Sequence, residues 1–167
     1  MYVSFVFVAI FIGYSIGVAP IVGFHYGSGD VSELQSLRKK SLFLVTFASV
    51  ALAVVAMLLS RPLAVLFVGN DEVLFKMTAT AFRFYSVSVL FSGFSIFGSA
   101  FFTALNNGFV SAAISFLRTM VFQAAAVIVL PMIFGIDGIW YSLFIAEILA
   151  MAVTFAFFAA NRKKYHY

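Results

Sequence analysis

Five stretches of roughly 20 or more mostly apolar residues dominate this sequence. A helix of that length crosses the roughly 30 Å hydrocarbon core of a bilayer, and backbone groups surrounded by lipid must hydrogen-bond within their own helix. A β-barrel would instead need short strands of alternating polarity. The pattern therefore predicts an all-α, polytopic transmembrane bundle with about five spans, at residues 2–24, 41–60, 80–105, 110–134 and 138–160.

The composition excludes a soluble domain and several chemical classes. Hydrophobic residues make up 64% of the 167 positions and charged residues only 10%, more apolar surface than a soluble core of this size can absorb. The net charge of +4 comes from basic residues at the ends of the apolar stretches, where they meet phospholipid headgroups. We therefore expect membrane lipids, and no nucleic acid, as partners. The absence of Cys excludes disulfides and thiolate metal sites.

The connections between the apolar stretches are short and contain helix-breaking residues. Gly, Ser and Asp occupy positions 27–30, Asn and Gly occupy 106–108, and two Gly flank positions 136–137. Short connections make neighbouring helices antiparallel. Residues 61–77 include an apolar piece, 62–68, that is too short to span, and they are predicted to form an interfacial segment rather than a sixth span.

Two basic clusters set the predicted orientation. Four spans separate them, so they must lie on the same side of the membrane, which the positive-inside rule makes the cytoplasmic side of the cell membrane. The amino terminus then lies outside and the carboxy terminus inside. Their expected roles are topology signals and lipid anchors. The clusters are Arg38, Lys39, Lys40 and Arg162, Lys163, Lys164.

The beginning of the chain also bears on domain organisation. Met1 stands almost directly before apolar residues, with no charged flank to direct insertion. We therefore expect residues 1–167 to form a single incomplete bundle, with further sequence upstream. The alternative is a complete five-span protein with an outward amino terminus.

Arg118 and Glu147 are predicted to lie deep inside their spans. Glu147 is roughly 14 Å from the outer end of its helix and Arg118 roughly 12 Å from the cytoplasmic end of its own. An isolated charge at that depth costs several kcal/mol, so each should face protein or water. Their helices are antiparallel neighbours, and a water or another partner could fill the several-ångström mismatch in depth. A structural ion pair and a role in proton or substrate handling both remain open.

The remaining candidates are a hinge and an enzyme site. Pro20 removes a helical hydrogen bond, and Gly17 and Gly23 allow close approach, so this region is either a hinge or a tightly packed kink. His25 and His166 lie too far apart to supply a metal site, and no activated nucleophile motif occurs. The sequence predicts no enzyme, no metal and no catalytic residue.

Three ordered motifs give the chain a family resemblance. Residues 17–29 read GVAPIVGFHYGSG, residues 102–108 read FTALNNG with Ser111, Ser115 and Arg118 after them, and residues 135–140 read GIDGIW before Ala146 and Glu147. Together they resemble the carboxy-terminal half of the MATE (multidrug and toxic compound extrusion) transporters, in the MepA-like and DinF-like bacterial branch. The likeness covers nearly the whole chain.

The resemblance implies helices eight to twelve of a twelve-helix, two-lobe transporter, with the amino-terminal lobe as a missing partner. It implies antiport of small amphipathic cationic drugs, coupled to H⁺ or Na⁺, by alternating access in the bacterial inner membrane, with no other cofactor. Residues 80–105 lack the carboxylate of the sodium-coupled branch that resembles NorM, so a sodium site of that type is doubtful in this half. The alternatives are a lipid-linked polysaccharide flippase of the same superfamily and a non-transporting membrane assembly subunit.

Overall fold

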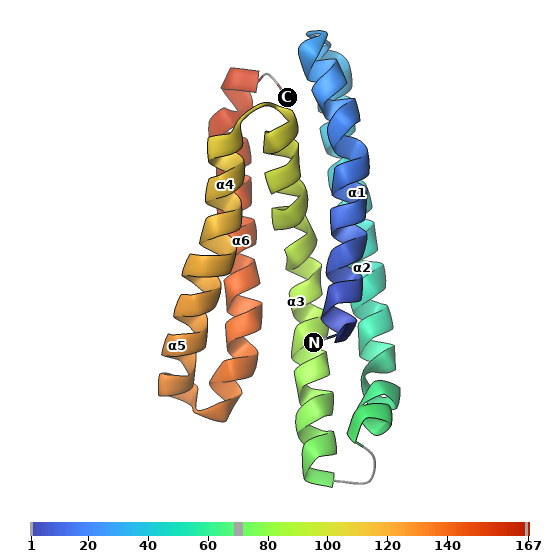
Figure 1. Cartoon of the computed structure of the whole chain (residues 1–167), viewed down its shortest axis with the longest axis vertical. Helices are drawn as coiled ribbons and strands as arrows, with labels where there is room; N and C mark the ends of the chain where they lie inside the picture. Colours follow the sequence, from blue (N-terminus) through green and yellow to red (C-terminus); the bar gives the residue numbers. More distant parts are fainter. Residues whose placement is uncertain (1, 69–71, 166) are drawn as a thin grey trace.

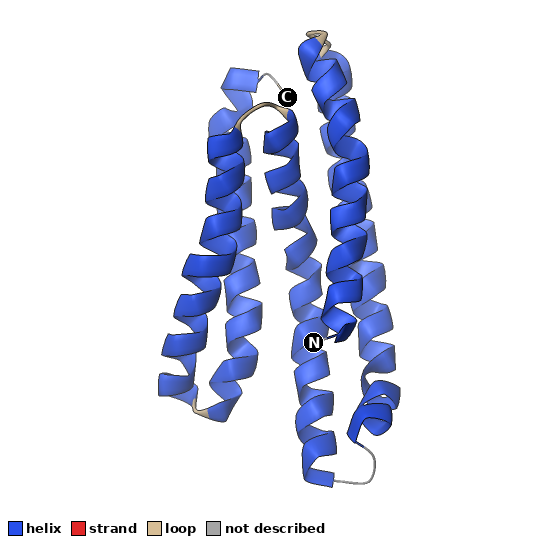
Figure 2. Ribbon diagram, in the orientation of Figure 1, coloured by secondary structure: helices blue, strands red, loops and turns tan. Residues whose placement is uncertain are grey.

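The computed structural model describes residues 2–68, 72–165 and 167, nearly all of them in helices (Figures 1 and 2). No strand occurs in this described part of the chain. Five helical segments are long and apolar enough to cross a membrane. This confirms the predicted all-α fold class with five spans. The elements are α1 (Tyr2–Gly27), α2 (Val31–Val68), α3 (Glu72–Ala104), α4 (Gly108–Phe116), the π-helical segment η1 (Leu117–Phe122), α5 (Gln123–Phe134) and α6 (Ile136–Tyr165). Because α4, η1 and α5 follow without a break, they form one long helix.

The predicted interfacial segment at 61–77 is wrong as a separate element. Helix α2 continues through Pro62 to Val68, and α3 already begins at Glu72; residues 69–71 lie outside the described part of the chain. Pro62 removes one hydrogen bond without ending the helix, and the lower end of α2 turns aside in Figure 1. Both helices are therefore longer than the hydrocarbon requires, and their ends extend beyond the predicted spans.

The tight turns form where the breaking residues predict them. Gly29 and Gly135 adopt positive φ angles of 75° and 62°, and Asn106 adopts 57°, a left-handed conformation that Asn tolerates better than most residues. The side chain of Asn107 accepts a hydrogen bond of 3.3 Å from the amide of Val110 and so caps α4. These turns make successive long helices antiparallel.

Helix α3 is the central element of the bundle. It packs against α1 and α2 on one side and against α4 and α6 on the other, so it joins two groups of helices (Figure 1). The buried core near one end is aromatic, because rings from α3 and α6 and from the carboxy terminus pack edge to face or tilted. The rings of this core belong to Phe97, Phe101, Phe102, Phe158 and Tyr167.

The two basic clusters lie at the same end of the bundle, as predicted from the four spans between them. The guanidinium of Arg38 stands over the ring of Tyr167 at 5.1 Å from its centroid. Arg162 and Lys163 line a cavity with that same ring. The contact through Tyr167 joins α2 to the end of α6 and so brings the clusters together.

Candidate functional site

Arg118 and Glu147 form a direct ion pair between η1 and α6. The Nη2 of Arg118 lies 2.7 Å from Oε1 of Glu147, and Nε lies 3.1 Å and 3.0 Å from the two carboxylate oxygens. Two adjacent guanidinium nitrogens thus donate to one carboxylate, the strongest arrangement for this pair of side chains. The two side chains therefore meet directly, and no water or other partner is required to bridge the difference in depth expected from the sequence.

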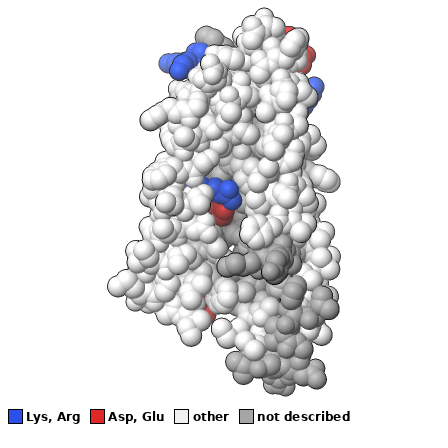
Figure 3. Space-filling view, in the orientation of Figure 1, with Lys and Arg blue, Asp and Glu red and all other residues white. Residues whose placement is uncertain are grey.

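The pair lies well inside the helices that carry it, away from their ends. Arg118 with Glu147 is the one Arg–carboxylate ion pair among the described residues. Figure 3 shows one patch of adjoining basic and acidic atoms in the middle of the visible face, with the other charged atoms near its edges. The side chains are 21% and 17% exposed. The pair is therefore largely enclosed by protein but open on one side.

Arg118 stands in the π-helical segment. The carbonyl of Arg118 accepts the amide of Gln123 five residues later, a spacing wider than that of an α-helix. Such segments rotate the following residues around the helix axis and occur often at functional sites. The straight-helix depth estimate could not include this distortion.

A cluster of four hydroxyls connects α3 to α4, leading toward the ion pair. Ser99 Oγ lies 2.9 Å from Ser111 Oγ and 2.8 Å from Ser115 Oγ. Thr103 Oγ1 lies 2.7 Å from Ser111 Oγ and donates to the carbonyl of Ser99 at 3.0 Å. Ser115 precedes Arg118 by one helical turn, so the hydroxyl cluster and the ion pair form consecutive parts of one polar strip.

The hydrogen bonds within the hydroxyl cluster fit one direction. Because Thr103 donates to a carbonyl, it accepts from Ser111. Ser99 Oγ lies 2.9 Å from Ser111 Oγ and donates at 3.2 Å to the carbonyl of Ser111, so its proton is directed at Ser111 and Ser99 accepts from Ser115. Thr103 and Ser115 are exposed, while Ser111 is buried. The cluster therefore borders the surface of the bundle and is not sealed in its core.

From the sequence alone, Ser111 and Ser115 were named, Thr103 was included only as part of the motif at 102–108, and Ser99 was missed. A signal was present, because the four hydroxyls stand four and eight residues on either side of Asn107. Residues placed symmetrically about a tight turn between antiparallel helices meet at the same heights. Ser and Thr hydroxyls within membrane spans usually donate to a carbonyl of their own helix. Because we expected this, the symmetric spacing about Asn107 was not recognised as a contact between two helices.

The other predicted residues lie away from this strip. Helix α1 is continuous through Pro20, and a Cβ placed at Gly23 would meet the Ala104 carbonyl oxygen at 3.6 Å, whereas one at Gly17 would meet nothing within 4 Å. A hinge role for this region stays a prediction. Within the described residues, no three His, Asp or Glu side chains gather as metal ligands do.

Five membrane-length helices with a paired charge and a hydroxyl cluster inside the spans define a polytopic α-helical membrane protein with an intramembrane polar site. The family model described as MatE matches residues 1–129. The chain therefore belongs to the MatE family. None of the curated proteins compared with it matches.

Solved structures share the fold. The crystal structure of the Vibrio cholerae MATE transporter VcmN in the bent form superposes with a TM-score of 0.87 at 17% identity, covering 97% of this chain and 37% of that chain. An inward-facing multidrug resistance MATE family transporter of the MOP superfamily gives 0.88 at 20% identity, covering 99% and 38%. This chain thus spans under two-fifths of the length of these transporters.

Proposed function

We propose that this chain acts as the carboxy-terminal lobe of a multidrug exporter, which exchanges amphipathic organic cations for H⁺ or Na⁺ by alternating access. One observation carries the proposal: the polar strip of hydroxyls and the Arg118–Glu147 pair is open on one side of the bundle. Polar groups within a span favour water or protein over lipid, so this side suits a cavity shared with a second lobe.

The ion pair provides a physical basis for exchange. An organic cation that approaches Glu147 competes with the guanidinium for the same carboxylate, while a proton removes the carboxylate's charge. Either event weakens the ion pair between Glu147 and Arg118. The π-helical segment that carries Arg118 can then change its hydrogen-bond pattern. Because one carboxylate cannot hold a proton and a cationic drug at full strength together, the two would exclude one another, as antiport requires.

The composition suits guests of varied shape. The chain contains 23 Phe and 6 Met. Aromatic faces attract organic cations, and flexible thioether side chains adapt to different outlines. A broad range of amphipathic cations is therefore the expected substrate class.

The alternatives fit the site less well. A polysaccharide flippase would need several free basic groups deep in the lobe for a pyrophosphate, yet Arg118 already holds a carboxylate. In a non-transporting assembly subunit, a polar strip exposed within the spans would cost free energy without serving a function. Export therefore explains the site better than either.

The proposed orientation in the cytoplasmic membrane can be tested by cysteine labelling. The chain has no Cys of its own, so single-cysteine variants report one position each. We expect Ser32→Cys and Asn161→Cys, beside the two basic clusters, to react with an impermeant maleimide only after the membrane is opened. Ile136→Cys, at the first residue of α6, should react from outside in intact cells. Outside labelling of both Ser32→Cys and Asn161→Cys would contradict the orientation.

Transport should require a second lobe. Alternating access in two-lobe transporters moves one bundle against the other around a central site. In liposomes with a proton or sodium gradient, residues 1–167 alone should export an organic cation dye no faster than empty vesicles, and adding a matching amino-terminal lobe should restore export. Gradient-driven export by this chain alone would refute its role as half of a transporter.

A further inference from the structure

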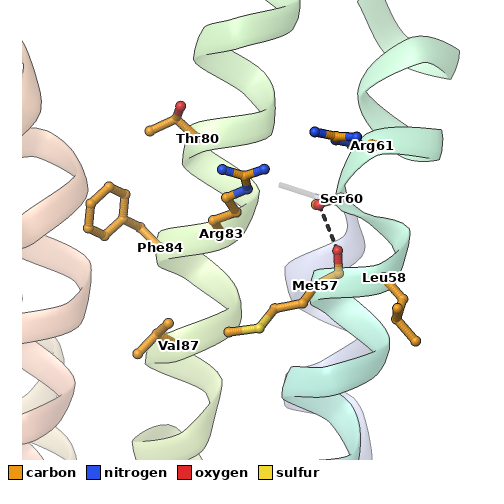
Figure 4. Close-up of a pocket in the computed structure, with 8 residues that line it drawn as sticks. All are labelled: Met57, Leu58, Ser60, Arg61, Thr80, Arg83, Phe84 and Val87. Carbon is orange, nitrogen blue, oxygen red and sulfur yellow. Dashed lines mark hydrogen bonds between the residues drawn. The ribbon is translucent and has the colours of Figure 1, made fainter.

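A second polar cavity lies between α2 and α3, toward the end of the bundle opposite the basic clusters. Its volume is about 640 Å³, and it lies on different elements from the Arg118–Glu147 pair (Figure 4). No function described above uses it. It is lined by Met57, Leu58, Ser60, Arg61, Thr80, Arg83, Phe84 and Val87.

Two arginines point into this cavity from opposite walls. Figure 4 shows Arg61 of α2 and Arg83 of α3 directed toward one another across the space between the helices. Across the residues that the structure describes, neither guanidinium has a hydrogen bond or ion pair with an acidic side chain. Two like charges that share a cavity repel one another, and a bound anion would turn that repulsion into attraction.

The other polar groups in the cavity leave hydrogen-bond donors in excess. The hydroxyl of Ser60 donates to the carbonyl of Met57 at 2.7 Å, so its proton is already used. Thr80 is exposed at the mouth and adds another hydroxyl. Each guanidinium carries five N–H donors in a planar fork that fits a phosphate or a carboxylate. The polar part of the cavity thus selects an anion with several acceptor oxygens.

Apolar lining residues lie next to the arginines on both helices. Met57 and Leu58 precede Arg61 by about one turn, Val87 follows Arg83 by about one turn, and Phe84 is the residue after Arg83. Because α2 and α3 run antiparallel, Met57 and Val87 both lie on the side of the arginines nearer the middle of the bundle, while Phe84 lies beside Arg83 and Leu58 points away from α3 (Figure 4). The cavity therefore has a basic end and an apolar end, aligned with the direction of a lipid molecule in the membrane.

From this arrangement we infer that the cavity binds an anionic phospholipid, with its phosphate between Arg61 and Arg83 and the start of an acyl chain against Met57, Phe84 and Val87. Basic pockets between transmembrane helices on the cytoplasmic side of membranes bind anionic lipid headgroups, and we apply the same chemistry here to the opposite leaflet, which the cavity faces in the proposed orientation. A free phosphate could satisfy the arginines but would leave the apolar end unfilled. The lipid would also join α2 to α3 near the end of α2 and the beginning of α3.

Photo-crosslinking tests this site on the intact chain reconstituted in nanodiscs. The probe is phosphatidylglycerol with a diazirine near the start of one acyl chain, and the matched probe is phosphatidylcholine with the same chains. We expect cross-links on Met57, Leu58, Phe84 or Val87 to be about tenfold stronger with the anionic probe. Arg61→Gln with Arg83→Gln should bring them to the phosphatidylcholine level.

Controls separate this site from general charge attraction. Lys163→Gln with Lys164→Gln removes the same charge at the opposite end and should leave these cross-links unchanged, and Arg61→Lys with Arg83→Lys should keep most of them. Excess unlabelled phosphatidylglycerol should compete, whereas millimolar inorganic phosphate should not. Equal cross-linking by the two probes, full cross-linking in the Gln pair while its helical content is retained, or competition by phosphate equal to that by the lipid would each overturn the inference.

Discussion

Replacing Glu147 with Gln should destabilise this chain by about 3 kcal/mol and stop export by the complete transporter. Gln keeps the volume of the side chain but removes the charge that accepts three contacts from Arg118. The guanidinium then remains largely enclosed within the spans without a counter-ion, which is the costly state of a broken buried pair. Unfolding by SDS titration in mixed micelles, followed by circular dichroism, measures the first effect. Dye efflux at matched protein level measures the second.

Glu33→Gln is the matched control for this change. Glu33 is exposed in the first turn of α2, and Gln there alters the same functional group without uncovering a buried charge. We expect its stability to change by less than about 0.5 kcal/mol and export to stay normal. If Glu147→Gln matches this control in both measurements, the carboxylate has neither a structural nor a transport role.

A double variant distinguishes the two roles that the sequence leaves open. Glu147→Gln combined with Arg118→Gln removes both charges, so the stability lost in the single variant should largely return. Under the proposed function the double variant is folded but does not export, because nothing remains to exchange a cation for a proton. Recovery of export together with stability would reduce the pair to a structural contact.

The sequence predicted the two charges to be deep and on neighbouring helices, and it left open whether they pair directly or through a water or another partner. The depth estimate assumed two straight α-helices with equal rise per residue. Hydropathy carries no signal for the π-helical segment at Leu117–Phe122, which changes the direction of side chains within the helix. Only the packing of η1 against α6 decides how Arg118 meets its partner.

Thr154 shows how far helical spacing alone can be used. It stands seven residues after Glu147, a spacing that places both residues on one face of a helix. In the structure Thr154 is fully buried, donates to the Ala150 carbonyl at 2.8 Å and belongs to the row of α6 that packs against α3. The spacing predicts which residues share a face, but the neighbouring helix determines whether that face carries a site or a packing contact.

The number of spans was predictable, whereas the ends of the helices were not. Apolar length indicates how many helices can cross the membrane, because the hydrocarbon core of a typical bilayer is about 30 Å thick. Beyond the hydrocarbon, polar and apolar residues are both tolerated in a helix, so composition cannot locate where α2 ends or α3 begins. Of the two arginines in the cavity, Arg61 lies in the extension of α2 beyond the predicted span 41–60, whereas Arg83 already lies within the predicted span 80–105.

Gly98 should be the least tolerant glycine at the α3–α6 contact. A Cβ built on Gly98 would overlap the Cγ2 methyl of Thr154 and lie 3.5 Å from Phe158 Cε2. Thr154 cannot easily rotate away, because its hydroxyl bonds to the Ala150 carbonyl. We expect Gly98→Ala to lower stability by about 2 kcal/mol through overpacking, although Ala favours a helix more than Gly does. SDS titration of the purified chain measures the change.

A second substitution tests whether the methyl group itself causes this loss. Thr154→Ser deletes Cγ2 but keeps the hydroxyl that bonds to Ala150, so Gly98→Ala combined with Thr154→Ser should regain most of the lost stability. Gly13→Ala is the matched control, because a Cβ there meets nothing within 4 Å and should be neutral or stabilising by up to about 1 kcal/mol. If Gly98→Ala is as stable as Gly13→Ala, α3 and α6 are farther apart than the structure places them. If only the double variant recovers, the contact between Gly98 and the Thr154 methyl sets the distance between the two helices.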